Sequence, residues 1–211
     1  MKAIVQERFG TPDVLRLADV DPPVPGPDEV LVRVAAAALN PYDWHMVRGD
    51  PLVARLTGGM GLRRPAALVA GVDGAGEVTA VGASVTELRP GDVVLGFCAG
   101  ALAEYARARA DRVVPRPARL SVEQAAAVPM AAVTALQGLR DVGGVRAGHR
   151  VLINGAAAAS ARTACRSRRR WARRSPACAA QPTANWSARS APCARSTTRS
   201  RTSPTAGSAT T

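Results

Sequence analysis

Residues 71–82 read GVDGAGEVTAVG, and the residues after the glycines decide the fold. Three glycines within six residues invite comparison with a dinucleotide fingerprint. Such a loop must open a helix, so that backbone N–H groups and the helix dipole meet the pyrophosphate. Here Glu77 to Val81 has the pattern of a strand instead. We therefore predict that these glycines relieve backbone crowding within a β domain.

Turn signals recur roughly every 10 to 15 residues around this stretch, which is typical of an all-β unit with short strands. Asp21 to Pro27 holds four prolines and a glycine, and Arg89 to Asp92 reads RPGD, a turn that feeds a strand. The predicted strands are Lys2 to Gln6, Val14 to Leu17, Glu29 to Ala36, Leu68 to Val81, Asp92 to Phe97, Ala101 to Ala106 and Arg112 to Pro115. Residues 1–120 are thus predicted to form a rolled or barrel-like β domain.

The pattern changes to helix at residue 120. Ser121 and Gln124 form an S-x-x-Q capping box before an alanine-rich run to Arg140, and Pro129 divides this run into two helical pieces. Arg150 to Asn154, reading RVLIN, resembles a buried parallel strand. A β domain, linking helices and a buried strand over residues 121–155 describe the opening of a nucleotide-binding sheet.

Charge and apolar content both change near Asn154. Residues 1–154 carry 17 basic and 16 acidic side chains, whereas residues 155–211 carry 11 arginines and no acidic residue. The pI of about 11.3 is therefore not the property of a basic fold. After Ile153 the chain has no Val, Ile, Leu, Phe, Met, Asp, Glu or Lys. Such a segment cannot offset the cost of ordering its backbone, so we expect residues 156–211 to be disordered.

Neither an export signal nor a membrane span is apparent, since no apolar run follows the N-terminus and about 18 consecutive apolar residues occur nowhere. We expect a cytoplasmic protein. The cysteines are Cys98, Cys165, Cys178 and Cys193, with no CxxC pair. This usage predicts reduced thiols without a disulfide framework.

Five blocks of the chain, in order, are similar to one known family. They are PGPDEVLVRVAAAALNPYDWHMVRG (25–49), GVDGAGEVTAVG (71–82), RPGDVVLGFCAGALAEYA (89–106), LSVEQAAAVPMAAVTALQGLRD (120–141) and RVLING (150–155). Together they resemble the zinc-independent quinone oxidoreductase branch of the medium-chain dehydrogenase/reductase superfamily. The resemblance implies a GroES-like β domain followed by a Rossmann domain, with NADPH bound in the cleft between them. It also implies a quinone or enone substrate, with homodimerisation possible in an intact protein.

Two departures from the zinc-dependent alcohol dehydrogenases of that superfamily predict that no metal is bound. Asn40 stands where those enzymes place a cysteine ligand, and Gly71, Val72 and Asp73 stand where they have a Gly-His-Glu motif. Zinc needs three or four Cys, His or carboxylate ligands, and only Asp73 remains as a conceivable one. Without zinc, hydride chemistry belongs to the nicotinamide, and the protein positions it and polarises the acceptor.

The resemblance places Asn40, Tyr42 and Asp43 nearest nicotinamide and substrate, as the predicted catalytic residues. Asn40 can donate to a quinone or enone oxygen as negative charge develops there. Alternatively, Asn40, Pro41 and Asp43 simply form a turn after a strand. Thr134 matches the family position whose hydroxyl faces the nicotinamide; it is equally an ordinary helix threonine that bonds back to a carbonyl. Asn40, Thr134, Asn154, Gly155 and Ala156 are the predicted cofactor-binding residues.

The phosphate loop should begin at Gly155, but the chain continues AAAASARTACRSRRRWARR. Loss of one base after the codon of Ala156 explains this composition, because reading the tail codons in the other frame permits GASGGVGT followed by an apolar helix. We therefore predict a frameshifted tail and impaired NADPH binding.

Two other interpretations stay open. One is an inactive GroES-like remnant of an enzyme. The other is nucleic-acid binding through the arginines and Trp171 and Trp186 of the tail, although any polycation binds nucleic acid loosely, and we expect no specific nucleic-acid partner.

Overall fold

The computed structural model describes residues 1–56, 60–146, 149, 151, 153 and 158–164 of the chain. It divides into two compact units, Met1–Gln137 and Gly138–Thr211. The first unit is built on β structure.

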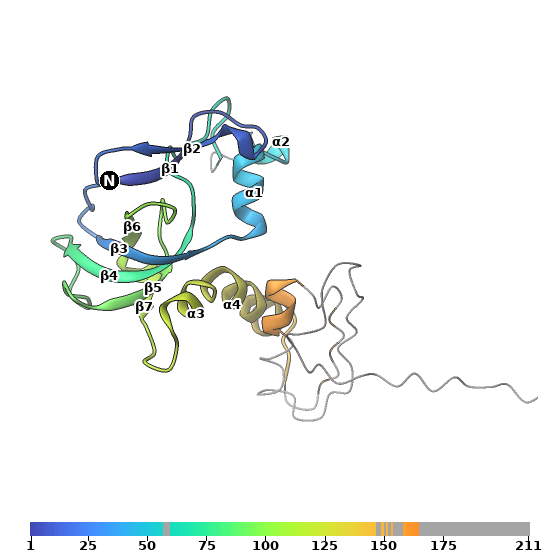
Figure 1. Cartoon of the computed structure of the whole chain (residues 1–211). Coiled ribbons are helices and arrows are strands. Elements are labelled where there is room, and N and C mark those ends of the chain that lie inside the picture. The colour runs from blue at the N-terminus through green and yellow to red at the C-terminus, as the bar shows by residue number, and fades with distance from the viewer. Residues whose placement is uncertain (57–59, 147–148, 150, 152, 154–157, 165–211) are drawn as a thin grey trace, which may run out of the picture. The chain divides into compact units, whose positions relative to one another are not determined.

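A five-stranded antiparallel sheet organises the first unit (Figure 1), with the strand order β6-β3-β4-β5-β7. Its strands are β3 (Glu29–Ala38), β4 (Asp73–Val81), β5 (Val93–Phe97), β6 (Tyr105–Arg109) and β7 (Val113–Pro115). A separate antiparallel pair consists of β1 (Lys2–Gln6) and β2 (Leu15–Asp19). Single bridges join β1 to Val69 and Ala103. The predicted β domain is confirmed.

Side chains that alternate along the strands build two apolar clusters. Val78 and Val94 are fully buried in the larger cluster, while Ala75 and Leu95 belong to a smaller cluster. Because successive residues of a strand point to opposite faces, the two clusters occupy opposite faces of the sheet. The smaller cluster also contains Ala125 and Ala126 of a helix that covers its face. This helix brings the chain after residue 120 onto the sheet.

The glycines of residues 71–76 lie where the backbone is crowded, as predicted. A Cβ atom on Gly76 would collide with the carbonyl oxygen of Arg33 on the neighbouring strand, and one on Gly74 would lie 3.4 Å from the Sγ atom of Cys98. Gly71 has a φ of +95°, which interrupts the extended backbone. For this reason β4 begins at Asp73 and not at Leu68, where the sequence predicts it.

Four short helices accompany the strands: α1 (Pro41–Arg48), α2 (Leu52–Leu56), α3 (Val122–Ala126) and α4 (Pro129–Leu136). Short 3-10 turns occupy Pro12–Val14 and Ala110–Arg112. The predicted capping box is present, since the Ser121 hydroxyl accepts from the Gln124 amide and the Gln124 side chain accepts from the Ser121 amide. Pro129 begins α4, as predicted. Helix α3 contacts β3 and β4, and α4 contacts β4 and β5.

The second unit is described only in part. A π-helical segment spans Gln137–Val142 across the boundary of the units, and residues 159–164 are helical. Of the predicted strand Arg150–Asn154, only residues 151 and 153 are described, so this strand stays a prediction. Residues 165–211, which include most of the predicted disordered tail, lie outside the described residues.

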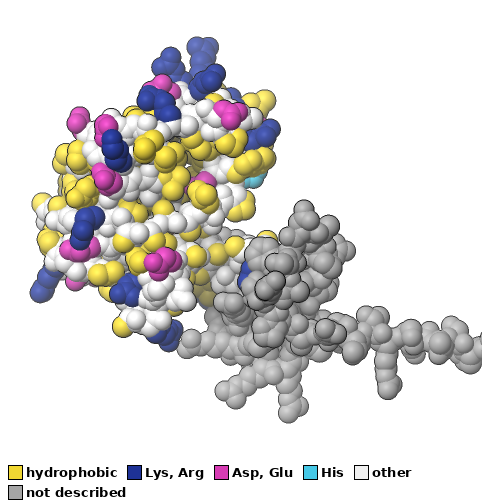
Figure 2. Space-filling model, viewed as in Figure 1, with side chains coloured by type: hydrophobic (Ala, Val, Ile, Leu, Met, Phe, Trp, Pro, Cys, Tyr) yellow, Lys and Arg dark blue, Asp and Glu magenta, His cyan; other side chains and the backbone are white. Residues whose placement is uncertain are grey.

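Charged side chains of both signs are interspersed on the face shown in Figure 2, and residues 1–154 carry 17 basic and 16 acidic side chains. No helix among the described residues is both long and apolar enough to cross a membrane.

Candidate active site

Asn40 ends the loop after β3 and is the N-cap of α1. Its φ and ψ of −124° and 162° are those of extended backbone, and Pro41 follows at the first helical position. The backbone N–H of Asn40 donates to the Asp43 carboxyl at 2.7 Å, and the Asp43 amide donates to the Asn40 carbonyl at 3.0 Å. Gly49 closes the helix with a φ of +67°. The predicted turn is therefore the first turn of a helix.

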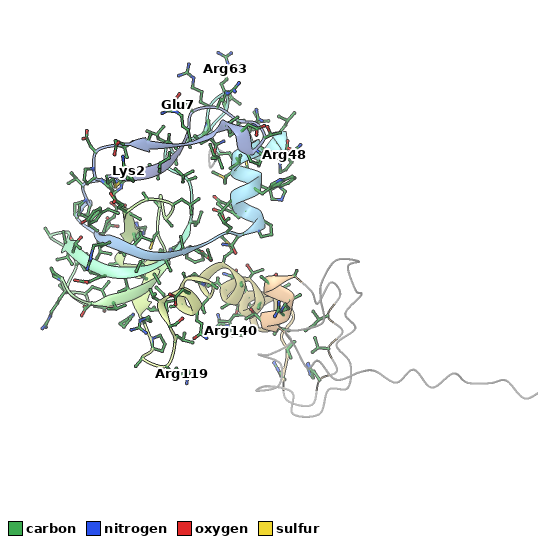
Figure 3. The ribbon with its side chains drawn as sticks, viewed as in Figure 1. Lys2, Glu7, Arg48, Arg63, Arg119 and Arg140 are labelled. Carbon is green, nitrogen blue, oxygen red and sulfur yellow. The ribbon has the colours of Figure 1, made fainter. Side chains whose placement is uncertain are left out.

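Helix α1 is anchored at its other end as well. The buried Gln6 side chain donates to the carbonyl groups of Met46 and Val47, and Arg55 donates to the carbonyl of Gly49 at 2.7 Å. Arg48, labelled in Figure 3, lies over the ring of Trp44 at 4.8 Å. Fixed at both ends, α1 gives Asn40 and Asp43 a defined place beside the sheet.

Asp73, the first residue of β4, meets Asn40 from the sheet. It is fully buried, and its Oδ2 atom accepts from the Asn40 Nδ2 atom at 3.1 Å and from the Met130 amide at 2.9 Å. Its Oδ1 atom has no hydrogen-bond partner among the described residues. One carboxyl group thus links the loop after β3 to the first turn of α4.

Burial raises the pKa of both carboxyl groups. The pKa of Asp73 is raised mainly by desolvation and further by the charge of Asp43, while the bonds from Met130 and Asn40 oppose the rise. Desolvation likewise raises the pKa of Asp43 against the bond from the Asn40 amide. Two buried carboxyl groups around one asparagine make a strongly polar spot in an apolar surrounding, which is typical of functional sites.

Cys98 lies close to this spot but remains a thiol. Desolvation and the charge of Asp73 raise its pKa to about 12, and it is fully buried. A thiol with so high a pKa does not form the nucleophilic thiolate near neutral pH. Cys98 is free, as predicted; Cys165, Cys178 and Cys193 lie outside the described residues.

The donors around Asp73 fit a hydrogen-bonded carboxyl group better than a zinc ligand. Asn40 and Met130 both direct N–H groups at the Oδ2 atom, so the lone pairs of that oxygen are taken up by hydrogen bonds. Among the described residues, no group of three or more His, Cys, Asp or Glu side chains could hold a metal ion.

The remaining predicted residues divide into two sets. Thr134 is exposed on α4, one helical turn beyond Met130, and its hydroxyl has no hydrogen-bond partner among the described residues. Tyr42 is exposed on the first turn of α1. Asn154, Gly155 and Ala156 lie outside the described residues. The structure therefore brings Asn40 and Asp43 into hydrogen-bond contact and leaves Tyr42 and Thr134 open to solvent.

Two features of this site were missed from the sequence. Helix α1 lacks an apolar period, but the Asn40 cap, Pro41, Asp43 at the third helical position and Gly49 are its start and stop signals. The role of Asp73 carried no local signal, because its partners lie 33 and 57 residues away in the chain.

Comparison with known proteins now identifies the fold. Residues 26–118 match the family described as the alcohol dehydrogenase GroES-like domain. The chain is 37% identical over 143 residues to the chloroplastic quinone-oxidoreductase homolog of Spinacia oleracea, a match that covers 65% of this chain and 41% of that protein.

Two solved structures are similar as well. The quinone oxidoreductase from Coxiella burnetii matches with a TM-score of 0.71 and 33% identity, covering 81% of this chain and 54% of that one. Mycobacterial Rv1454c complexed with NADPH matches with a TM-score of 0.68 and 30% identity, covering 78% and 48%. This chain thus spans about half the length of these relatives. Residues 26–118 thus match a GroES-like domain, and the chain is similar, over about half of their length, to quinone oxidoreductases of the medium-chain dehydrogenase/reductase superfamily.

Proposed function

We propose that this chain derives from an NADPH-dependent oxidoreductase that reduces quinones or conjugated enones by hydride transfer without zinc. The observation that carries the proposal is the hydrogen bond by which Asp73 holds the Asn40 side chain. Asp73 also bonds the start of α4, which exposes Thr134, and Asn40 begins α1, which exposes Tyr42. The relatives support the reaction class, since one is called a quinone-oxidoreductase homolog, another a quinone oxidoreductase, and a third is complexed with NADPH. Cytoplasmic location and homodimerisation belong to the same proposal.

Asn40 supplies the polar group for the acceptor. One hydrogen of its Nδ2 atom is committed to Asp73, and the other is left to donate to a substrate carbonyl oxygen as negative charge grows there. Such a donor stabilises the transition state more than the ground state, so it raises the rate of the chemical step.

Thr134 and Tyr42 contribute two further hydroxyl groups. The unpartnered Thr134 hydroxyl on α4 is suited to hold the carboxamide of a nicotinamide, and the exposed Tyr42 hydroxyl to meet the substrate. NADPH, when bound, supplies the hydride. The described residues therefore fit the nicotinamide end of the coenzyme, while Asn154, Gly155 and Ala156, proposed for the phosphates, lie outside them.

We further propose that this polypeptide binds NADPH weakly. The tail after Ala156 lacks the glycine-rich turn and apolar helix that a phosphate loop requires, and a shifted reading frame accounts for its composition. The inactive GroES-like remnant remains the second interpretation.

A titration of NADPH fluorescence separates these proposals. The full chain should show no saturable micromolar binding, whereas a chain with one base restored after codon 156 should bind NADPH and reduce a quinone. In the restored chain, Asn40→Ala should lower kcat about 100-fold, and Thr134→Ala should weaken NADPH binding. Thr86→Ala, at an exposed residue outside the helices and strands, is the matched control.

Two results would contradict the proposals. Saturable micromolar binding by the unaltered chain would refute the weak binding. Full activity of the restored Asn40→Ala variant would refute the role of Asn40. Sequencing the gene across the codons of Asn154 to Ser160 tests the frameshift directly.

A further inference from the structure

The Oδ2 atom of Asp73 joins two parts of the candidate site that are far apart in sequence. It accepts from the Asn40 side chain at 3.1 Å and from the Met130 backbone at 2.9 Å. We propose that Asp73 is a positioning residue, whose carboxyl group orients the Asn40 carboxamide and at the same time fixes the first turn of α4. It thereby sets Asn40 and Thr134 relative to each other. The purpose of this arrangement rests on the proposed function, but the arrangement itself can be tested without it.

Helix α4 needs an acceptor from outside its own sequence. The first N–H groups of a helix have no intrahelical partner, and a side chain at the N-cap usually accepts from one of them. The N-cap of α4 is Val128, which has no such group, and Pro129 has no N–H. Met130 is therefore the first residue of α4 with an amide to satisfy, and Asp73 accepts from it. A carboxylate also interacts favourably with the positive end of the helix dipole.

The second hydrogen bond selects one of two orientations of Asn40. A carboxylate only accepts hydrogen bonds, so the NH₂ group of Asn40 must face Asp73 and its carbonyl oxygen must face away. Without Asp73, rotation of the carboxamide by half a turn would exchange donor and acceptor. The carboxyl group thus decides which atoms of Asn40 a ligand meets.

The titratable groups near Asp73 decide whether its own ionisation can be followed. Asp43 on α1 raises the pKa of Asp73, and the neighbouring Cys98 thiol stays neutral because its own pKa is about 12. Helix α4 carries no titratable side chain between Pro129 and Leu136. Ionisation of Asp73 should therefore be sensed at both of its donors.

Nuclear magnetic resonance of the ¹⁵N-labelled full chain tests the proposal. The Asn40 carboxamide signals and the Met130 amide signal should shift with pH at one common midpoint, above the value of about 3.9 for an ordinary aspartate. If Asp73 served only to hold the start of α4, its ionisation would shift the Met130 signal alone. Different midpoints, or an Asn40 carboxamide that does not respond, would overturn the proposal.

Variants give a second, independent measurement. Asp73→Asn keeps an acceptor oxygen but should abolish the common pH response. Asp73→Ala should speed solvent exchange of the Asn40 and Met130 protons about tenfold or more. Asp92→Asn removes a carboxyl group that accepts from the Arg89 amide on an exposed turn, and it should leave both signals unchanged. An unaltered response in Asp73→Asn would contradict the proposal.

An NADPH titration of the chain with one base restored after codon 156 keeps the two proposals separate. Failure of that restored chain to bind NADPH, with an intact common midpoint in the unaltered chain, would count against the proposed function alone. Should Asp73→Ala fail to fold, the titration of the unaltered chain still decides the role of Asp73.

Discussion

Two carboxyl groups hold the two nitrogen atoms of Asn40. Asp43 accepts from the backbone nitrogen and Asp73 from the side-chain nitrogen. Both carboxyl groups are buried, so each retains its proton to a higher pH than an exposed aspartate does. Burial of this polar site therefore costs the desolvation of two carboxyl groups.

The raised pKa of Asp73 makes the stability of the fold depend on pH. Because the folded state binds this proton more tightly than the unfolded state, its stabilisation is complete below the unfolded pKa of about 3.9 and is lost as pH rises through the folded pKa. Asp73→Asn lacks this loss. Its equilibrium constant for unfolding should therefore fall below that of the unaltered chain, by up to about tenfold per pH unit within that window.

Urea unfolding at a series of pH values measures this difference. Comparison of two chains that differ at one site cancels the contribution of the other titrating groups, apart from the coupling to Asp43. A difference between the two chains that stays constant over the whole window would show that Asp73 has an ordinary pKa.

At the scale of elements, close approach of strands and capping of helices determine where the site lies. The end of β3, two residues before Asn40, lies beside the start of β4 at Asp73, since Ala38 pairs with Asp73 in their register. Helix α3 leads into α4, which brings the Met130 amide to the same place.

Gly76 permits the close pairing of β3 and β4. In Gly76→Ala the new methyl group would collide with the Arg33 carbonyl oxygen, so we expect a loss of about 1 to 3 kcal/mol in the free energy of unfolding. Gly138→Ala is the matched control, because nothing lies within 4 Å of its added Cβ atom. Chemical denaturation followed by circular dichroism measures both variants, and equal stabilities would refute the crowding at Gly76.

Ser121 stabilises the start of α3. Ser121→Ala removes the acceptor for the Gln124 amide, and we expect the free energy of unfolding to fall by about 1 kcal/mol. Ser84→Ala, at an exposed turn, should change the stability by less than about 0.5 kcal/mol. Thermal unfolding of the two variants checks this, and a cost shared by both would mean that the cap contributes nothing.

Local signals predicted the elements of this protein, and long-range contacts decided the rest. Alternation gave β1 and β3 nearly to the residue, and the capping box with Pro129 gave α3 and α4. The strand predicted at Ala101 begins only at Tyr105, because Gly100, with a φ of +81°, opens a turn that touches β1 by a single bridge at Ala103. Asn40 and Asp43 were found through family resemblance, whereas the pairing of Asp73 with Met130 depends on the folded sheet.

At the scale of the whole molecule, the sequence divides into a charge-balanced part and an arginine-rich part. If the arginine-rich part has no core, trypsin should remove it first and leave a fragment that retains residues 1–137, the first compact unit. Mass spectrometry of a limited digest identifies the fragment. Resistance of residues 165–211 under conditions that cleave the first unit would show that this part is folded.

The bonds from Asn40 and Met130 to Asp73 span 33 and 57 residues. A chain emerging from the ribosome cannot complete this constellation until Met130 has left the exit tunnel, although the last strand of the sheet already ends at Pro115. A product released between these two points would have every strand of the sheet and the pair Asn40–Asp73, but no start of α4 beside them.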